Sequence, residues 1–112
     1  MTRDCIFCKI AKKEIPSKIR YEDEEVIAFD DISPKAPIHI LIVPKIHINS
    51  LSAMGDAETD IATKLISVAK QIAKENNIDS FRLVFNSGKD AGMEIDHLHL
   101  HLLGGGKLGT MN

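Results

Sequence analysis

The chain has 112 residues, of which 44% are hydrophobic and 27% charged, and its net charge at pH 7 is −2. This composition is typical of a soluble globular protein and excludes a disordered chain, and the length suits one domain over residues 1–112. No apolar run approaches the roughly 20 residues of a membrane span, no signal peptide is evident and no basic block attracts nucleic acid, so we expect a cytoplasmic protein with neither a membrane nor a nucleic acid as partner.

The first expected element is a short helix over residues 5–13, in the stretch CIFCKIAKK, which ends near Pro16. It carries both cysteines of the chain, Cys5 and Cys8. A structural disulfide is disfavoured in a reducing compartment, which leaves metal binding, redox chemistry or simple packing as a small hydrophobe. The CxxC spacing supplies half of a zinc site, so the sequence alone leaves these alternatives open.

A hairpin is expected next. Residues 18–21 and 26–29 are suited to two strands, and the acidic residues 22–25 between them form its solvated turn.

A central strand is expected over residues 38–43, because this run is rich in Ile and Val and follows an irregular connection stiffened by Pro34 and Pro37. His39 lies within it, and a lone histidine in a covered strand is usually a satisfied structural residue. We therefore expect His39 to have no catalytic role.

A long amphipathic helix is expected over residues 56–77, with Asp56 as its N-cap and the asparagines 76 and 77 as its end. Its apolar positions recur every three or four residues: Ile61, Leu65, Val68 and Ile72. This stripe predicts a helix that covers one face of the sheet.

Two further strands, over residues 81–86 and 97–103, complete the chain. The order helix, three strands, helix, two strands, with short links between neighbouring strands, predicts an α+β fold: an antiparallel sheet of about five strands with one long and one short helix.

The last strand alternates His97, His99 and His101 with leucines. Alternate residues of a strand share a face, so we expect the leucines in the core and the histidines on an exposed or dimer-covered surface. Histidines two residues apart are spaced by roughly 6.6 Å, so the three cannot converge on one metal ion. A row of imidazoles instead suits a phosphate-bearing substrate, because imidazole is a nucleophile when neutral and an acid when protonated. The alternative is a polar strand face without chemistry.

The stretch HLHLHLLGG resembles the motif of the histidine triad (HIT) family, and the segments CIFCKIAKKEIPSKIRYEDEEVIAFDDISPKAPIHILIVPKIHI and FNSGKDAG resemble its HINT branch, the nucleoside phosphoramidases. The similarity covers residues 5–105. It implies a HIT-like fold that dimerises into a continuous sheet, and an enzyme that binds purine nucleotides. The implied reaction is hydrolysis of AMP-amine (phosphoramidate) or mixed-anhydride linkages through a covalent nucleotidyl-histidine, without an organic cofactor.

The resemblance also implies a role for individual residues. The catalytic residues would be His99 as nucleophile, His101 at the phosphate and leaving group, and His97 in a supporting shell with His47. The implied nucleotide site has Asp31 on the ribose, an apolar slot for the base, and a loop that faces the phosphate. Its residues are Phe7, Ile10, Phe29, Asp31, Ile32, Asn86, Gly92, Met93, Glu94, Ile95, His99 and His101.

Bacterial members that carry the CxxC motif imply a structural zinc ion held by Cys5, Cys8, His47 and His97. The chain departs from the HINT pattern at Met93 and Glu94, where the branch often has hydrogen-bond donors near the phosphate. Hydrolysis of dinucleoside polyphosphates, and nucleotide binding with little catalysis, are therefore retained as alternatives.

Overall fold

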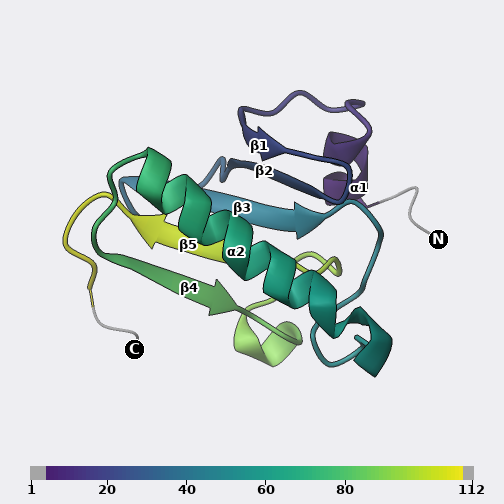
Figure 1. Cartoon of the computed structure of the whole chain (residues 1–112). Coiled ribbons are helices and arrows are strands. Elements are labelled where there is room, and N and C mark those ends of the chain that lie inside the picture. Colours follow the sequence, from purple (N-terminus) through teal and green to yellow (C-terminus); the bar gives the residue numbers. More distant parts are fainter. Residues whose placement is uncertain (1–4, 110–112) are drawn as a thin grey trace.

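A five-stranded antiparallel sheet organises the chain, and the computed structural model describes it over residues 5–109 (Figure 1). The strands lie side by side in the order β1-β2-β3-β5-β4. Along the chain, three strands separate the short helix α1 from the long helix α2. The elements are α1 (Ile6–Ala11), β1 (Ile19–Glu22), β2 (Val26–Asp30), β3 (Ile38–Pro44), α2 (Thr59–Glu75), β4 (Phe81–Phe85) and β5 (Leu100–Gly104). The expected α+β class, the element order and the number of strands are confirmed.

One face of the sheet packs against α2, which crosses it diagonally (Figure 1). The helix contributes the expected apolar stripe, in which Leu65, Val68 and Ile72 are at most 2% exposed. The sheet contributes alternate residues of its strands, including Ile40 and Leu102, both 0% exposed. The apolar face of the helix and the apolar face of the sheet therefore pack together into one core.

The opposite face of the sheet packs against α1. The strand residues whose side chains point away from α2 form a second apolar cluster. In it, Ile27 and Phe29 of β2 contact Phe7 and Ile10 of α1. Because α1 is only 6 residues long, it covers the β2 and β3 part of this face. His99 and His101 lie beyond it on the same face, beside an open cavity.

The last strand begins at Leu100, so the expected start at His97 is wrong. Ile42 is the last residue of β3 to pair with β5, opposite Leu100. Continued register would place Leu98 opposite Pro44, which has no N–H to donate, so the ladder stops there. His97 and His99 consequently lie on irregular backbone that leaves the sheet.

The histidine side is also more buried than expected, since His97 is 0% and His99 7% exposed. The expectation of an exposed or dimer-covered row is wrong for these two residues, because α1 and the loop before β5 cover them within the same chain.

Two element ends differ from expectation. A 3₁₀ turn at Asp56–Glu58 precedes α2, and the Glu58 carboxylate accepts a hydrogen bond from the N–H of Gly55, so Asp56 is not the N-cap. The short helix ends at Ala11 rather than near residue 13. Asn76 does end α2, and Asn77 follows it with a φ of 56°.

The acidic turn after β1 is less solvated than expected. The Asp23 carboxylate accepts hydrogen bonds from the N–H groups of Glu25 and Val26, and it forms an ion pair with Lys64 of α2 at 3.0 Å. The turn therefore anchors the hairpin to the long helix.

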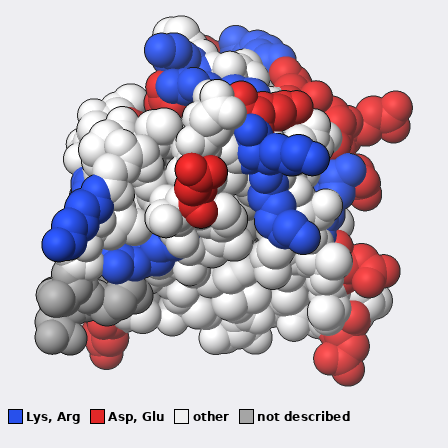
Figure 2. All heavy atoms as spheres, turned by 60° about the vertical axis from the view of Figure 1, so that its left-hand side comes forward, with Lys and Arg blue, Asp and Glu red and all other residues white. Residues whose placement is uncertain are grey.

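Charge is mixed on the surface in view in Figure 2, where acidic and basic side chains lie among one another above a largely uncharged area. Among residues 5–109, no helix is both long and apolar enough to cross a lipid bilayer.

The assignment of helix faces can be tested by paired substitutions in α2. Leu65→Ala should lower the free energy of unfolding by about 2–5 kcal/mol, because Leu65 is 0% exposed. Ile66→Ala should lower it by less than about 1 kcal/mol, because the neighbouring Ile66 is 40% exposed. Urea denaturation of both variants measures the difference, and equal losses would contradict this packing.

Candidate active site and metal cluster

A cavity of about 420 Å³ opens on the sheet face that carries His99 and His101. Its walls come from α1, the end of β2, the loop before β3 and the loop before β5. The volume is in the range of small-molecule sites, and the lining is mainly apolar with a few charged groups. We call it the first cavity.

The first cavity brings together ten of the twelve residues expected to bind a nucleotide: Phe7, Ile10, Phe29, Asp31, Ile32, Gly92, Glu94, Ile95, His99 and His101. The other two lie elsewhere. Met93 is 6% exposed and does not line this cavity, and Asn86 lines a neighbouring one.

Eight further lining residues were missed by the sequence reasoning: Ile6, Ile15, Pro16, Ser17, Asp30, Ser33, Lys35 and Leu41. Leu41 is the instructive case. It stands opposite both Phe29 and His101 in the strand pairing, so its place follows only from the register between three strands. Ile6, Asp30 and Ser33 directly adjoin expected residues in the chain, and that proximity was the available signal. Residues 15–17 and Lys35 adjoin none of them, so no local signal marked them.

His99 is held by the backbone of the residue two positions before it. Its Nδ1–H donates a hydrogen bond to the carbonyl oxygen of His97 at 2.7 Å. A neutral imidazole that carries its proton on Nδ1 has a lone pair on Nε2. His99 therefore presents a nucleophilic nitrogen at the wall of the first cavity.

His101 has the opposite tautomer, and His39 sets it. The N–H of Lys35 donates to Nδ1 of His39 at 3.0 Å, so the proton of neutral His39 lies on Nε2. That Nε2–H donates to Nδ1 of His101 at 2.9 Å, which leaves the proton of His101 on Nε2. His39 is thus buried, as expected, but it also orients a residue of the cavity.

The Nε2 atom of His101 is buried and has no hydrogen-bond partner within residues 5–109. An unsatisfied buried donor costs roughly 1–3 kcal/mol, and an anionic oxygen bound in the cavity would remove that cost. The orphaned donor therefore favours a negatively charged ligand beside His101.

Burial keeps both rings of this pair neutral. It lowers the pKa of His101 to about 4, with the nearby charges of His99 and His39 acting in the same direction, and it lowers the pKa of His39. Because the unfolded pKa of His101 is 6.5, the unfolded chain binds more protons between pH 4 and 6.5. The stability due to neutral His101 is complete above about pH 6.5 and is lost as the pH falls toward 4.

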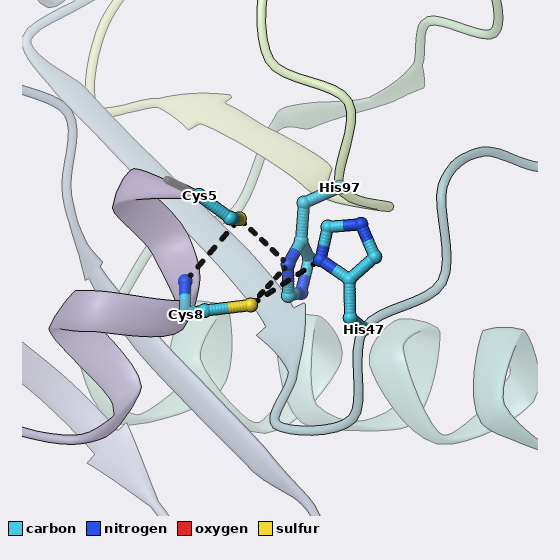
Figure 3. A group of neighbouring side chains, drawn as sticks. All are labelled: Cys5, Cys8, His47 and His97. Carbon is cyan, nitrogen blue, oxygen red and sulfur yellow. Dashed lines mark hydrogen bonds between the residues drawn. The ribbon is translucent and has the colours of Figure 1, made fainter. Parts of the chain in front are cut away.

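Cys5, Cys8, His47 and His97 form a cluster at the start of α1, and their side chains point toward one another (Figure 3). The shortest contacts join Cys5 Sγ to His97 Nδ1 and Cys8 Sγ to His47 Nδ1, both at 3.2 Å. Zinc bonds of about 2.0–2.3 Å give a tetrahedron with edges of roughly 3.3–3.8 Å, close to these separations.

The outer hydrogen bonds of the two histidines also fit a metal. Nε2 of His97 donates to the carbonyl oxygen of Pro44 at 2.9 Å, and Nε2 of His47 donates to Asn49 Oδ1 at 2.7 Å. Both rings therefore turn the lone pair of Nδ1 inward, as metal ligation requires. The four residues can hold one metal ion, and their two sulfur and two nitrogen donors suit zinc.

Asp31, His39 and His101 also lie close enough to hold a metal ion. Their hydrogen bonds oppose it. Nδ1 of His39 accepts a hydrogen bond from the backbone N–H of Lys35, so the proton of the neutral ring lies on Nε2, which then has no lone pair for a metal. This group is a hydrogen-bonded triad.

Comparison with known proteins identifies the chain. Residues 4–110 match the family model described as "Scavenger mRNA decapping enzyme C-term binding". A purine nucleoside phosphoramidase of Escherichia coli K12 is 44% identical over 113 residues, which covers 99% of this chain and 95% of the relative.

Solved structures agree with this. A histidine triad protein from Clostridium difficile has a TM-score of 0.95 and 50% identity, and the match covers 98% of this chain and 97% of that one. A HIT family hydrolase from Legionella pneumophila has a TM-score of 0.91 and 41% identity, with 96% and 97% covered.

The fold and the row of histidines beside a cavity define a protein of the histidine triad class, as the sequence resemblance implied. The chain belongs to the HIT family, and it is an enzyme of that family.

The two tautomers can be observed directly. At pH 7, long-range ¹H–¹⁵N spectra should show His99 protonated on Nδ1 and His101 protonated on Nε2, because the partner at Nδ1 accepts a hydrogen bond from His99 and donates one to His101. Across a pH titration His101 should titrate at about 4, since burial opposes its charged form. His39→Ala serves as the matched variant, in which His101 should lose its preference for Nε2. The same tautomer at both histidines would refute the network.

Proposed function

We propose that this protein hydrolyses purine nucleotide phosphoramidates, AMP joined to an amine, through a covalent intermediate on His99. The observation that carries the proposal is the hydrogen bond from His99 Nδ1 to the His97 carbonyl, which leaves Nε2 as a fixed nucleophile at the cavity wall. The names of the Escherichia coli and Legionella pneumophila relatives support a hydrolase that acts on purine nucleosides.

The nucleoside would occupy the apolar part of the first cavity. Phe7 and Phe29 have ring centroids 5.5 Å apart and offer flat apolar surface to a base. Asp31 has a side chain that is 18% exposed, and its Oδ1 accepts the N–H of Ser33. This bond holds the carboxylate at the rim, where it can accept hydrogen bonds from the ribose hydroxyls.

In the first step, Nε2 of His99 attacks the α-phosphorus and the bond between phosphorus and the amine nitrogen breaks. The amine nitrogen takes a proton from solvent and leaves as a neutral amine. Nε2–H of His101 donates a hydrogen bond to a phosphoryl oxygen and stabilises the charge that accumulates there.

In the second step, water attacks the phosphorus of the nucleotidyl-histidine. The bond from phosphorus to Nε2 breaks, AMP is released and His99 returns to its neutral Nδ1–H form. Each atom of the water ends in AMP or in solvent, so the cycle is balanced.

We also propose that Cys5, Cys8, His47 and His97 hold a structural zinc ion. The support is the inward orientation of the four donor atoms and the absence of a fifth position for substrate in a closed Cys₂His₂ set. When bound, zinc would cross-link α1 to the loops after β3 and before β5.

We propose further that the protein is a cytoplasmic homodimer. Two cysteines that serve as metal ligands together with His47 and His97 are consistent with a reducing compartment. β4 is an edge strand with an apolar sequence, FRLVF, and its unpaired backbone can join a second copy into a continuous sheet.

The nucleophile can be tested with adenosine 5′-phosphoramidate. His99→Ala should reduce kcat by more than about 10³-fold while AMP still binds, because the variant removes the attacking nitrogen and leaves the apolar slot. Rapid quenching of the wild type followed by mass spectrometry should find AMP on His99. Lys107→Gln is the control, because this exposed residue does not line the first cavity, and it should keep the wild-type kcat.

Turnover of the His99 variant at the wild-type rate would overturn the assignment. AMP binding without a covalent adduct or turnover in the wild type would instead favour a nucleotide-binding module, and a strong preference for dinucleoside polyphosphates would favour the other hydrolase branch.

Metal content gives an independent test of the cluster. Protein purified without an affinity tag should contain about one zinc per chain, and Cys8→Ser should lose most of it, because Cys8 contacts both histidine ligands. His39→Ala should retain zinc, because its group is unsuited to a metal. Plasma emission spectrometry measures the content, and zinc unchanged by Cys8→Ser would exclude this site.

A further inference from the structure

A second cavity of about 360 Å³ adjoins the first. The two share Asp31, Lys35, Gly92, Glu94 and His101 in their walls, whereas His99 lines only the first. His101, whose Nε2–H has no protein partner within residues 5–109, therefore lies at the boundary between them.

The outer wall of the second cavity comes from β4. Arg82 pairs with Leu103 and Val84 pairs with His101 across the sheet, so these side chains share the face of the histidines. Asn86, which the family resemblance implied as part of the nucleotide site, lines this cavity as well. No residue of the apolar base slot contributes to it.

Two cations in this wall have no acidic partner among residues 5–109. One nitrogen of the Arg82 guanidinium donates to the carbonyl oxygen of Gly109 at 2.8 Å, and neither Arg82 nor the Lys35 ammonium forms an ion pair within residues 5–109. Arg82 is half-buried, and its remaining N–H groups form a planar fork suited to a carboxylate.

The position of the second cavity suits a leaving group in a displacement at phosphorus. The attacking and leaving atoms lie on opposite sides of the phosphorus in an in-line reaction. With His99 and the nucleoside in the first cavity and His101 at the boundary, the second cavity is the space left for the leaving group.

We propose that the second cavity binds the leaving amine and selects amines that carry a carboxylate, with Arg82 as the main specificity-determining residue. This proposal rests on the proposed phosphoramidate hydrolysis. A single carboxylate fits better than a phosphate group, because Asp31 and Glu94 in the same wall oppose a second negative charge.

Two substrates that differ only in one charge provide the test. In the first, β-alanine is joined through its nitrogen to the phosphorus of AMP; in the second, β-alaninamide takes its place. The wild type should have a kcat/KM about tenfold higher for the carboxylate substrate, the factor expected of a charge-assisted hydrogen bond. Arg82→Gln should bring this ratio to about one, and Arg82→Lys should restore part of it.

Lys107→Gln is the matched control, because it removes an exposed positive charge that lines neither cavity. Its ratio should equal that of the wild type. Urea denaturation and sedimentation of each variant show whether it folds and keeps its oligomeric state.

A wild-type ratio near one, or an Arg82→Gln variant that slows both substrates by the same factor, would overturn the proposal.

Calorimetric binding of the two compounds to His99→Ala separates the amine subsite from the proposed function. If neither compound is hydrolysed by the wild type, the proposed function fails. A tenfold binding preference for the carboxylate, abolished when Arg82→Gln is added, would still support the subsite, and equal binding would refute it.

Discussion

The backbone carbonyl of His97 is the point on which the site depends. It accepts a hydrogen bond from Nδ1–H of His99 and so fixes Nε2 as the nitrogen of that ring with a free lone pair. The ring of the same residue is held between the Pro44 carbonyl and the two cysteine sulfurs. One fully buried residue thus connects the four-residue cluster, the end of the central strand and the ring of His99, and a displacement of either of the first two would move that ring.

Proline at the end of β3 creates the room for this arrangement. Because Pro44 cannot donate, β5 stops pairing at Leu100, and the three residues before it leave the sheet. The carbonyl oxygen of Pro44 instead accepts a hydrogen bond from Nε2 of His97. The site therefore lies on the irregular backbone between α1 and the first paired residue of β5. Side chains there can reach positions that the alternation of a regular strand would not allow.

The periodic parts of the fold could be predicted from the sequence, and the geometry of the histidines could not. Leu65, Val68 and Ile72 follow the period of a helix, and Leu100 and Leu102 that of a strand, because one buried face imposes each pattern. His97 satisfies the same strand period without belonging to the strand. The roles of His39 and Leu41 depend on pairing between strands distant in sequence, which local pattern does not contain. Ten of twelve expected cavity residues do converge, but their part in binding still rests on family resemblance.

The four-residue cluster also has a consequence for how the chain matures. Cys5 and His97 are 92 positions apart, so the last donor of the set is synthesised long after the first three. An emerging polypeptide that ends before this residue offers only three donors on segments that have not yet met. The complete set of four donors therefore exists only when the two distant segments meet in the native topology, so a metal ion that binds all four stabilises the folded chain over the unfolded one.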